Sequence, residues 1–111
     1  MIDEAFEQII KFRDDRDWKQ FHNPKDLAIS INLEAAELLE NFQWTGHETE
    51  VPGKNDRIIE ELADVFIYCV LMADAMNVEI GQIIKEKLKK SGMKYEVEKA
   101  RGSKKKYTEL G

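Results

Sequence analysis

The sequence predicts an all-α protein, and three observations carry that prediction. Glycine and proline are scarce, with six and two among 111 residues, which favours a mostly helical protein over a β-rich one. Apolar residues recur every three or four positions over long segments. Asn23-Pro24 is a strong helix start, because Asn is a favoured N-cap and Pro suits the first helical position. We therefore expect one domain over residues 1–111, a four-helix bundle with a basic tail from about residue 93.

The first two helices are expected over residues 2–16 and from Pro24 to residue 41 or 42. In the first, Ala5, Ile9 and Phe12 form an apolar stripe whose role is packing. In the second, a continuous polar stripe accompanies the apolar one. Its members follow one another at helical spacings: Ser30, Glu34, Glu37 and Asn41.

The third helix is expected to begin near residues 54–56 and to end near 76, after a loop over 43–55. From Val65 onward it has no polar face, so it must be buried on all sides. Three other short helices cover only part of it, which implies a subunit interface. A fourth helix is expected over 79–90, with Gly92 as its C-cap, and the tail 93–111 is expected to be extended or loosely ordered.

Charge and composition narrow the function classes. Residues 1–84 carry 18 acidic and 7 basic side chains, whereas residues 85–111 carry 4 acidic and 10 basic ones. An overall acidic chain argues against nonspecific binding of nucleic acid, and the basic lysines are either a solvated tail or contacts for a polyanion. The sequence shows no signal peptide pattern and no apolar run long enough to span a membrane. With a single cysteine, Cys69, these features predict a cytoplasmic protein.

Two acidic steps are the strongest candidates for chemistry. Glu34 and Glu37 lie three residues apart in one predicted helix, and Glu61 and Asp64 do so in the next. Each step directs two carboxylates to one side of its helix, among apolar neighbours. Either step alone is usually an exposed acidic pair, whereas two matched steps on adjacent helices are either exposed acids of amphipathic helices or a site for a divalent cation such as Mg²⁺.

Other residues could complete a site for a phosphorylated, planar ligand. Trp18 and Trp44 fall in predicted connections, where they either stack on a base or fill the core. Lys87 and Lys94 are candidates for contacting phosphates, unless they are solvated surface lysines. His22 could donate a hydrogen bond to a ligand, although a lone histidine is more often structural.

The combination of these motifs resembles a known family. The motifs are Arg16-Asp17-Trp18-x-x-Phe21-His22-x-Pro24, the E-x-x-E step, Phe42-Gln43-Trp44 and Glu61-Leu-Ala-Asp64-Val-Phe-Ile-Tyr68. Together they resemble the MazG-like all-α nucleoside triphosphate pyrophosphohydrolases, in particular the dCTP pyrophosphatase-like group. The resemblance covers almost the whole chain.

The resemblance implies Mg²⁺-dependent cleavage of a nucleoside triphosphate between the α and β phosphates, with deoxynucleotides such as dCTP favoured and Mn²⁺ as an alternative ion. It also implies a homodimer or a dimer of dimers. Which carboxylate activates the attacking water is left open. By motif position, the catalytic and metal-binding residues are Glu34, Glu37, Glu61 and Asp64. The implied substrate-binding residues are Trp18, His22, Trp44, Tyr68, Lys87, Ser91 and Lys94.

Two positions depart from the family pattern, and one of them is Glu96, which stands where the family commonly has proline. Ser91 stands where the family commonly has asparagine, and a hydroxyl replaces an amide with two donors and an acceptor. The base preference of relatives therefore does not transfer directly. Two alternatives remain at this point: a pyrophosphohydrolase for another nucleotide such as phosphoribosyl-ATP, and a noncatalytic helical oligomer that binds a partner protein.

Overall fold

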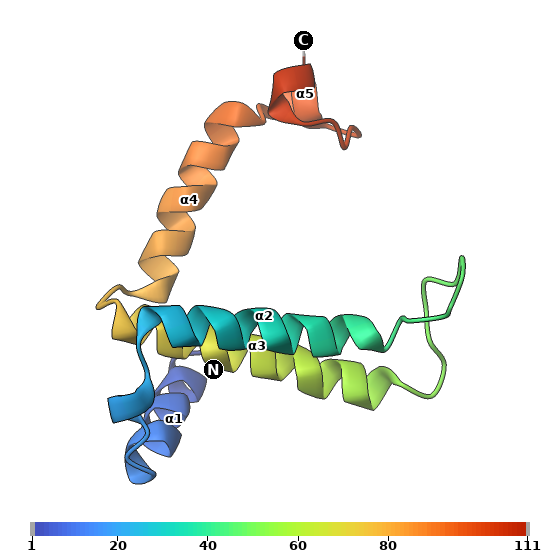
Figure 1. Ribbon diagram of the computed structural model, residues 1–111. Coiled ribbons are helices and arrows are strands. Elements are labelled where there is room, and N and C mark those ends of the chain that lie inside the picture. Colours follow the sequence, from blue (N-terminus) through green and yellow to red (C-terminus); the bar gives the residue numbers. More distant parts are fainter. Residues whose placement is uncertain (1, 111) are drawn as a thin grey trace. The chain divides into compact units, whose positions relative to one another are not determined.

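The computed structural model describes residues 2–110, and within that range all regular structure is helical. Four long helices confirm the predicted all-α class (Figure 1). The helices are α1 (Ile2–Asp15), α2 (Pro24–Glu40), α3 (Asn55–Ala75), α4 (Ile80–Lys94) and the short α5 (Val97–Ala100), with 3₁₀ turns η1 (Lys19–Phe21) and η2 (Tyr107–Glu109). None of the helices within residues 2–110 is long and apolar enough to cross a membrane.

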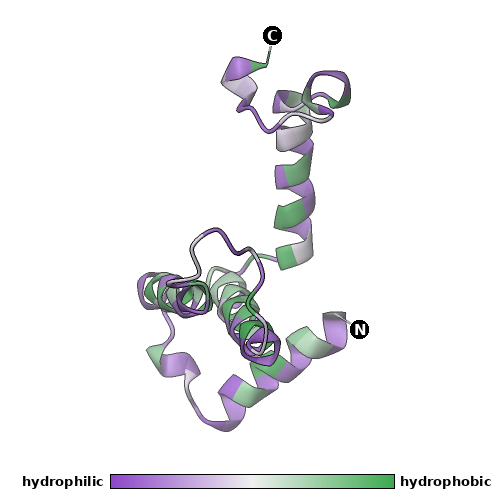
Figure 2. Cartoon of the chain, turned by 90° about the vertical axis from the view of Figure 1, so that its right-hand side faces the viewer, coloured by the Kyte–Doolittle hydropathy of each residue, from purple (hydrophilic) through white to green (hydrophobic). Residues whose placement is uncertain are grey.

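The chain divides into two compact units. The first contains α1, α2 and α3 and ends at Asn77, and the second begins at Val78 and contains α4 and α5. In Figure 2, α1 and α4 change between hydrophilic and hydrophobic colours from turn to turn, as amphipathic helices do. The expectation of a single domain over the whole chain stays a prediction.

The start of α2 is built as its sequence predicts. The Asn23 side-chain oxygen accepts a hydrogen bond from the backbone N–H of Asp26 at 2.9 Å, and its amide donates to the Asp26 carboxylate at 2.7 Å. Pro24 occupies the first turn, where its missing N–H costs nothing. These contacts determine where α2 begins.

In the first unit, α2 and α3 pack side by side and run in opposite directions (Figure 1), and α1 packs against α3. Leu27 of α2 is the most deeply buried large side chain, with 1% of its surface exposed. Val70, Leu71 and Ala73, near the end of α3, complete the small buried core. The core therefore gathers where α2 begins and α3 ends.

A buried arginine ties α1 to α3. The Arg13 side chain is 4% exposed and donates from Nη1 to Asp74 Oδ2 at 2.5 Å and from Nε to Asp14 Oδ1 at 2.9 Å. Burial works against the charged guanidinium, but the hydrogen bonds and charges of Asp74 and Asp14 outweigh burial and raise the pKa of Arg13. An ion pair thus anchors the C-terminal end of α1.

Two expectations for the second unit were wrong. Helix α4 continues through Gly92 to Lys94, and the N–H of Tyr95 donates to the Ser91 carbonyl at 2.8 Å. A glycine within a helix costs only about 1 kcal/mol relative to alanine, so its presence alone does not end one. The tail is also not simply extended, because it contains α5 and η2, and the rings of Tyr95 and Tyr107 meet edge to face at 6.0 Å.

Large apolar side chains remain exposed along α2 and α3. Leu33 is 58% exposed on α2, and Ile59 and Phe66 are 63% and 60% exposed on α3. The apolar part of α3 is therefore only partly covered in one protomer. This exposure is consistent with a subunit interface, which stays a prediction.

Candidate metal and nucleotide site

The four predicted carboxylates lie on the paired helices α2 and α3 and act on one another electrostatically. Glu34 is half-buried, and its Oε2 atom is buried without a hydrogen-bond partner. Burial raises the pKa of Glu34, and so do a hydrogen bond with Glu37 and the negative charges of Glu37, Asp64 and Glu61. The two acidic steps of the sequence thus form one cluster of negative charge.

Glu61 is the member of the cluster that already has partners. Asn41 Nδ2 donates to Glu61 Oε2 at 2.5 Å, and Arg57 Nε lies 3.3 Å from Glu61 Oε1. The Glu61 side chain is 12% exposed, whereas that of Arg57 is 69% exposed. The two oxygens of Glu61 are therefore held by different groups, one buried and one at the surface.

The donor set fits a hard divalent cation. Within residues 2–110, no three or more Asp, Glu, His or Cys side chains converge into a preformed metal cage. However, Glu34 has a buried carboxylate oxygen without a hydrogen-bond partner, and it lies beside three other carboxylates. A hard divalent cation that takes these oxygens as ligands would stabilise them. The residues that would hold such an ion are Glu34, Glu37, Glu61 and Asp64.

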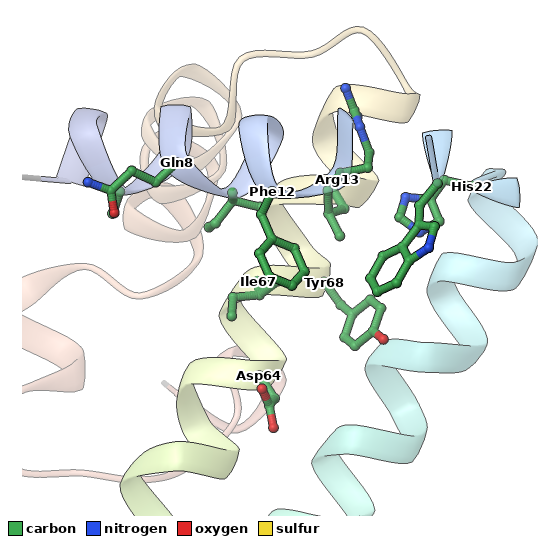
Figure 3. Close-up of a pocket in the computed structure, with 11 residues that line it drawn as sticks. Gln8, Phe12, Arg13, His22, Asp64, Ile67 and Tyr68 are labelled. Atoms are coloured by element: carbon green, nitrogen blue, oxygen red, sulfur yellow. The ribbon is translucent and has the colours of Figure 1, made fainter. Parts of the chain in front are cut away.

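A cavity of about 480 Å³ opens beside the cluster, between α1, α3 and the turn that follows α1 (Figure 3). Asp64 belongs to both the cluster and the cavity lining, and Tyr68 lies one turn further along α3. The lining residues are Ala5, Gln8, Ile9, Phe12, Arg13, Trp18, His22, Asp64, Ile67, Tyr68 and Leu71. A ligand in this cavity would be surrounded by apolar and aromatic side chains, with the Asp64 carboxylate at one edge.

Trp18 and His22 enter the cavity from the turn after α1. The turn is shaped by Asp17, which has a positive φ of 53°, and by a hydrogen bond from the Trp18 N–H to the Arg13 carbonyl at 3.1 Å. The Trp18 ring packs edge to face on Phe12 with ring centroids 5.7 Å apart. The structure thus brings three predicted binding residues, Trp18, His22 and Tyr68, into one lining.

The surroundings of His22 favour its neutral form. Its Nδ1 atom is buried without a hydrogen-bond partner. Burial lowers the pKa of His22, and the positive charge of Arg13 lowers it further. A neutral imidazole can offer one donor and one acceptor to a ligand.

The lining residues from α1 were not identified as site residues from the sequence. Phe12 and Ile9 lie on the apolar stripe of the first helix, whose predicted role was packing. Gln8 and Arg13 belong to none of the sequence motifs. In Figure 3 the Phe12 ring points toward Ile67 on α3, while the Arg13 side chain points away from the cavity. Their role depends on how α1 crosses α3, for which the sequence holds no local signal.

Trp44 lies apart from this cavity within one protomer. It sits in the connection between α2 and α3, with a positive φ of 66° and 92% of its surface exposed. It is not among the residues that line the cavity with Trp18. A single protomer therefore does not place both tryptophans around one ligand.

The remaining predicted binding residues belong to the second unit. Lys87, Ser91 and Lys94 follow at spacings of four and three residues along α4, so they share one helix face. The Lys94 ammonium lies 4.8 Å from the centre of the Tyr107 ring, a cation–π contact that links α4 to the tail.

Comparison with known proteins identifies relatives over most of the chain. The model of the MazG-like family matches residues 29–110. dCTP pyrophosphatase 1 from Mus musculus is 37% identical over 105 residues, covering 90% of this chain and 62% of the relative, and the Homo sapiens protein is 36% identical over the same extent. The chain thus spans less than two thirds of the length of these curated relatives.

A solved structure shares the fold of this chain. The crystal structure of a pyrophosphatase from Archaeoglobus fulgidus superimposes with a TM-score of 0.77 and 37% sequence identity. The match covers 86% of this chain and 92% of that one.

Proposed function

Since the chain belongs to the MazG-like family, we propose that it is a nucleoside triphosphate pyrophosphohydrolase. It would hydrolyse a nucleoside triphosphate between the α and β phosphates to the monophosphate and pyrophosphate, with Mg²⁺ as the cofactor and deoxynucleotides such as dCTP as favoured substrates. The naming of relatives as dCTP pyrophosphatases supports the substrate class.

The observation that carries the proposal is the position of Asp64. It lies in the carboxylate cluster and also lines the aromatic cavity. A nucleotide whose base occupies the cavity therefore has its phosphates close to the carboxylates. Such an arrangement suits a substrate with one planar, apolar end and one highly charged end.

Within this proposal, Glu34, Glu37, Glu61 and Asp64 hold Mg²⁺, with Mn²⁺ as a substitute. When bound, the cation polarises the phosphoryl oxygens and offsets the charge that develops on them. The protein's carboxylates also supply a base that accepts a proton from the attacking water.

The cavity would bind the nucleoside. A base can pack against the Trp18 ring, and Tyr68 would line the sugar or the base. His22, whose neutral form is favoured, would offer hydrogen bonds. By motif position, Lys87 and Lys94 on α4 would contact phosphates, where positive charge is needed, and Ser91 would contact the nucleotide.

The proposal includes a homodimer or a dimer of dimers. Phe66, Ile59 and Leu33 leave an apolar surface on α2 and α3 that association would cover. Trp44, exposed and remote from the cavity of its own protomer, would then flank the base in the cavity of a second copy.

A direct test is to incubate the purified protein with each NTP and dNTP and with phosphoribosyl-ATP, in the presence of Mg²⁺, and to resolve the products by chromatography. We expect the monophosphate and pyrophosphate, fastest from deoxynucleotides. A diphosphate product contradicts cleavage between the α and β phosphates. No hydrolysis of any nucleotide would favour the noncatalytic partner-binding module instead.

Two variants on α2 make the test specific to the cluster. Glu37→Gln keeps the size of the side chain but removes a charge that a cation needs, so turnover should fall by at least roughly 100-fold. Glu40→Gln is the matched control, because Glu40 is exposed on the same helix and outside the cluster. Equal rates for the two variants would contradict the assignment of the site.

A further inference from the structure

Asn41 is the polar residue most deeply buried beside the carboxylate cluster. It follows the last residue of α2 and is 3% exposed, the same fraction as Arg13. Only these two polar residues are buried to that degree in the part of the chain that the structure describes. A buried amide that is not needed for the core calls for a specific role.

The surroundings of Asn41 determine how its amide is oriented. Its Nδ2 atom lies 2.5 Å from Glu61 Oε2, 3.1 Å from the Leu38 carbonyl and 3.3 Å from the Glu37 carbonyl. All three neighbours are hydrogen-bond acceptors, so the NH₂ group must face them. One of its two protons serves Glu61, and the α2 carbonyls share the other.

This arrangement holds one oxygen of Glu61 through a buried side chain and the other through an exposed one. Oε2 accepts a hydrogen bond from the buried amide of Asn41, and a bond to an ionised acceptor is stronger than one between neutral groups. Oε1 has only Arg57, at 3.3 Å and 69% exposed, as a partner. Exposed ion pairs contribute little, so Arg57 is the partner that a competing cation displaces more easily.

We propose that Asn41 is a positioning residue that orients Glu61 for a divalent cation, with Glu61 Oε1 as the ligand atom and Arg57 as the group that gives way. This inference rests on the proposed function, because it needs the cation that the cluster is proposed to hold. Asn41 does not touch substrate. It acts through Glu61, in the way that hydrogen-bonded neighbours orient metal ligands in proteins generally.

The Asn41–Glu61 hydrogen bond joins two helices. Asn41 and Glu61 are 20 residues apart and belong to the end of α2 and the first half of α3. The bond therefore also sets how the E-x-x-E step of α2 faces the E-x-x-D step of α3. Losing it should loosen the cation site while leaving Trp18 and His22, which line the cavity from the turn after α1, in place.

The test measures binding of Mn²⁺ alone to the nucleotide-free protein, by the loss of the free Mn²⁺ signal in electron paramagnetic resonance. Asn41→Leu keeps the branching and the number of heavy atoms of the side chain but removes the donor, and it should raise the Kd for Mn²⁺ by roughly 10-fold or more. Arg57→Gln removes the competing cation and should leave the Kd unchanged or lower it. A higher Kd for Arg57→Gln overturns the assignment of Oε1 as the ligand atom.

A double-mutant cycle separates positioning from a general structural role. In a Glu61→Gln background, Asn41→Leu should change the Kd less than roughly twofold, because the group through which it acts is gone. The same loss in both backgrounds, or no loss in the wild-type background, overturns the inference. If Asn41→Leu does not fold, as judged by circular dichroism, Asn41→Ser replaces it, since a serine hydroxyl can bond the α2 carbonyls but is too short for Glu61.

The outcomes also distinguish this inference from the proposed function. Wild-type protein that binds no Mn²⁺ would contradict both. Wild-type protein that binds Mn²⁺ and hydrolyses nucleotides, with Asn41→Leu binding Mn²⁺ as tightly, would contradict only the role of Asn41.

Discussion

Removing the Asp74 carboxylate should destabilise the protein more than removing the Arg13 guanidinium to which it binds. The Arg13 side chain is 4% exposed, whereas the side chains of Asp74 and Asp14 keep 39% and 51% of their surface. Without Asp74, a buried cation is left with a single acid. Without Arg13, two acids remain that water already reaches, so neither becomes a buried unpaired charge.

The magnitudes follow from this asymmetry. Breaking a fully buried ion pair by removing one partner costs about 3–5 kcal/mol. In Asp74→Ala, Asp14 still binds Arg13 at 2.9 Å, so we expect a smaller loss of about 2–3 kcal/mol in the free energy of unfolding. In Arg13→Met, methionine keeps most of the apolar stem, and the expected loss is about 1 kcal/mol.

Urea denaturation followed by circular dichroism measures both values, at several protein concentrations so that any association is accounted for. The exposed pair Lys11–Asp15, on the same helix at 2.7 Å, is the matched control. Asp15→Ala should change the unfolding free energy by less than about 0.5 kcal/mol. If Arg13→Met costs as much as Asp74→Ala, the reasoning from burial is refuted.

Three further outcomes are expected. Leu27→Ala should cost about 3 kcal/mol in urea denaturation, because Leu27 is 1% exposed and its loss leaves a cavity; a loss below about 1 kcal/mol would mean that the site collapses. Burial and the charge of Arg13 lower the pKa of His22 in the folded protein. The unfolded chain therefore binds the proton more readily. The stability that neutral His22 contributes is present above the pKa of the unfolded chain and is lost as the pH falls through the lower pKa of the folded protein. The difference in unfolding free energy between wild type and His22→Gln should therefore shrink between about pH 8 and about pH 5, and a constant difference counts against this account. Trp44→Ala should alter stability by less than about 0.5 kcal/mol, since Trp44 is 92% exposed, but should raise the KM for the nucleotide; an unchanged KM would remove Trp44 from the proposed site.

The local features of the fold were predictable because their causes lie within a few residues. The N-cap Asn23 and Pro24 determine the start of α2, and helical periodicity predicted α1 and α3 to within one or two residues of their observed ends. Gly92 shows the limit of such signals. A glycine permits a helix to end but does not require it, and α4 runs on to Lys94.

The candidate site was predictable in part. The spacing of Glu34 and Glu37 predicted that both carboxylates share a face of α2, and the buried, unpaired oxygen of Glu34 is consistent with that. The contribution of α1 to the cavity was missed. Phe12 looks the same in the sequence whether it fills a core or lines a cavity, because only the crossing of α1 over α3 decides between them.

By itself, the sequence determined where α1, α2 and α3 lie, which acids share a face and which motifs place the chain among its relatives, because caps, periodicity and motifs are local. Only the tertiary structure decided that Asn41 binds Glu61, 20 residues away, and that Arg13 binds Asp74, 61 residues away. Those pairs depend on how α1, α2 and α3 pack in register, which is set by the burial of side chains such as Leu27 and Leu71 across the whole unit. The same packing decided that one oxygen of Glu61 is bound by a buried amide while the other is bound by an exposed guanidinium.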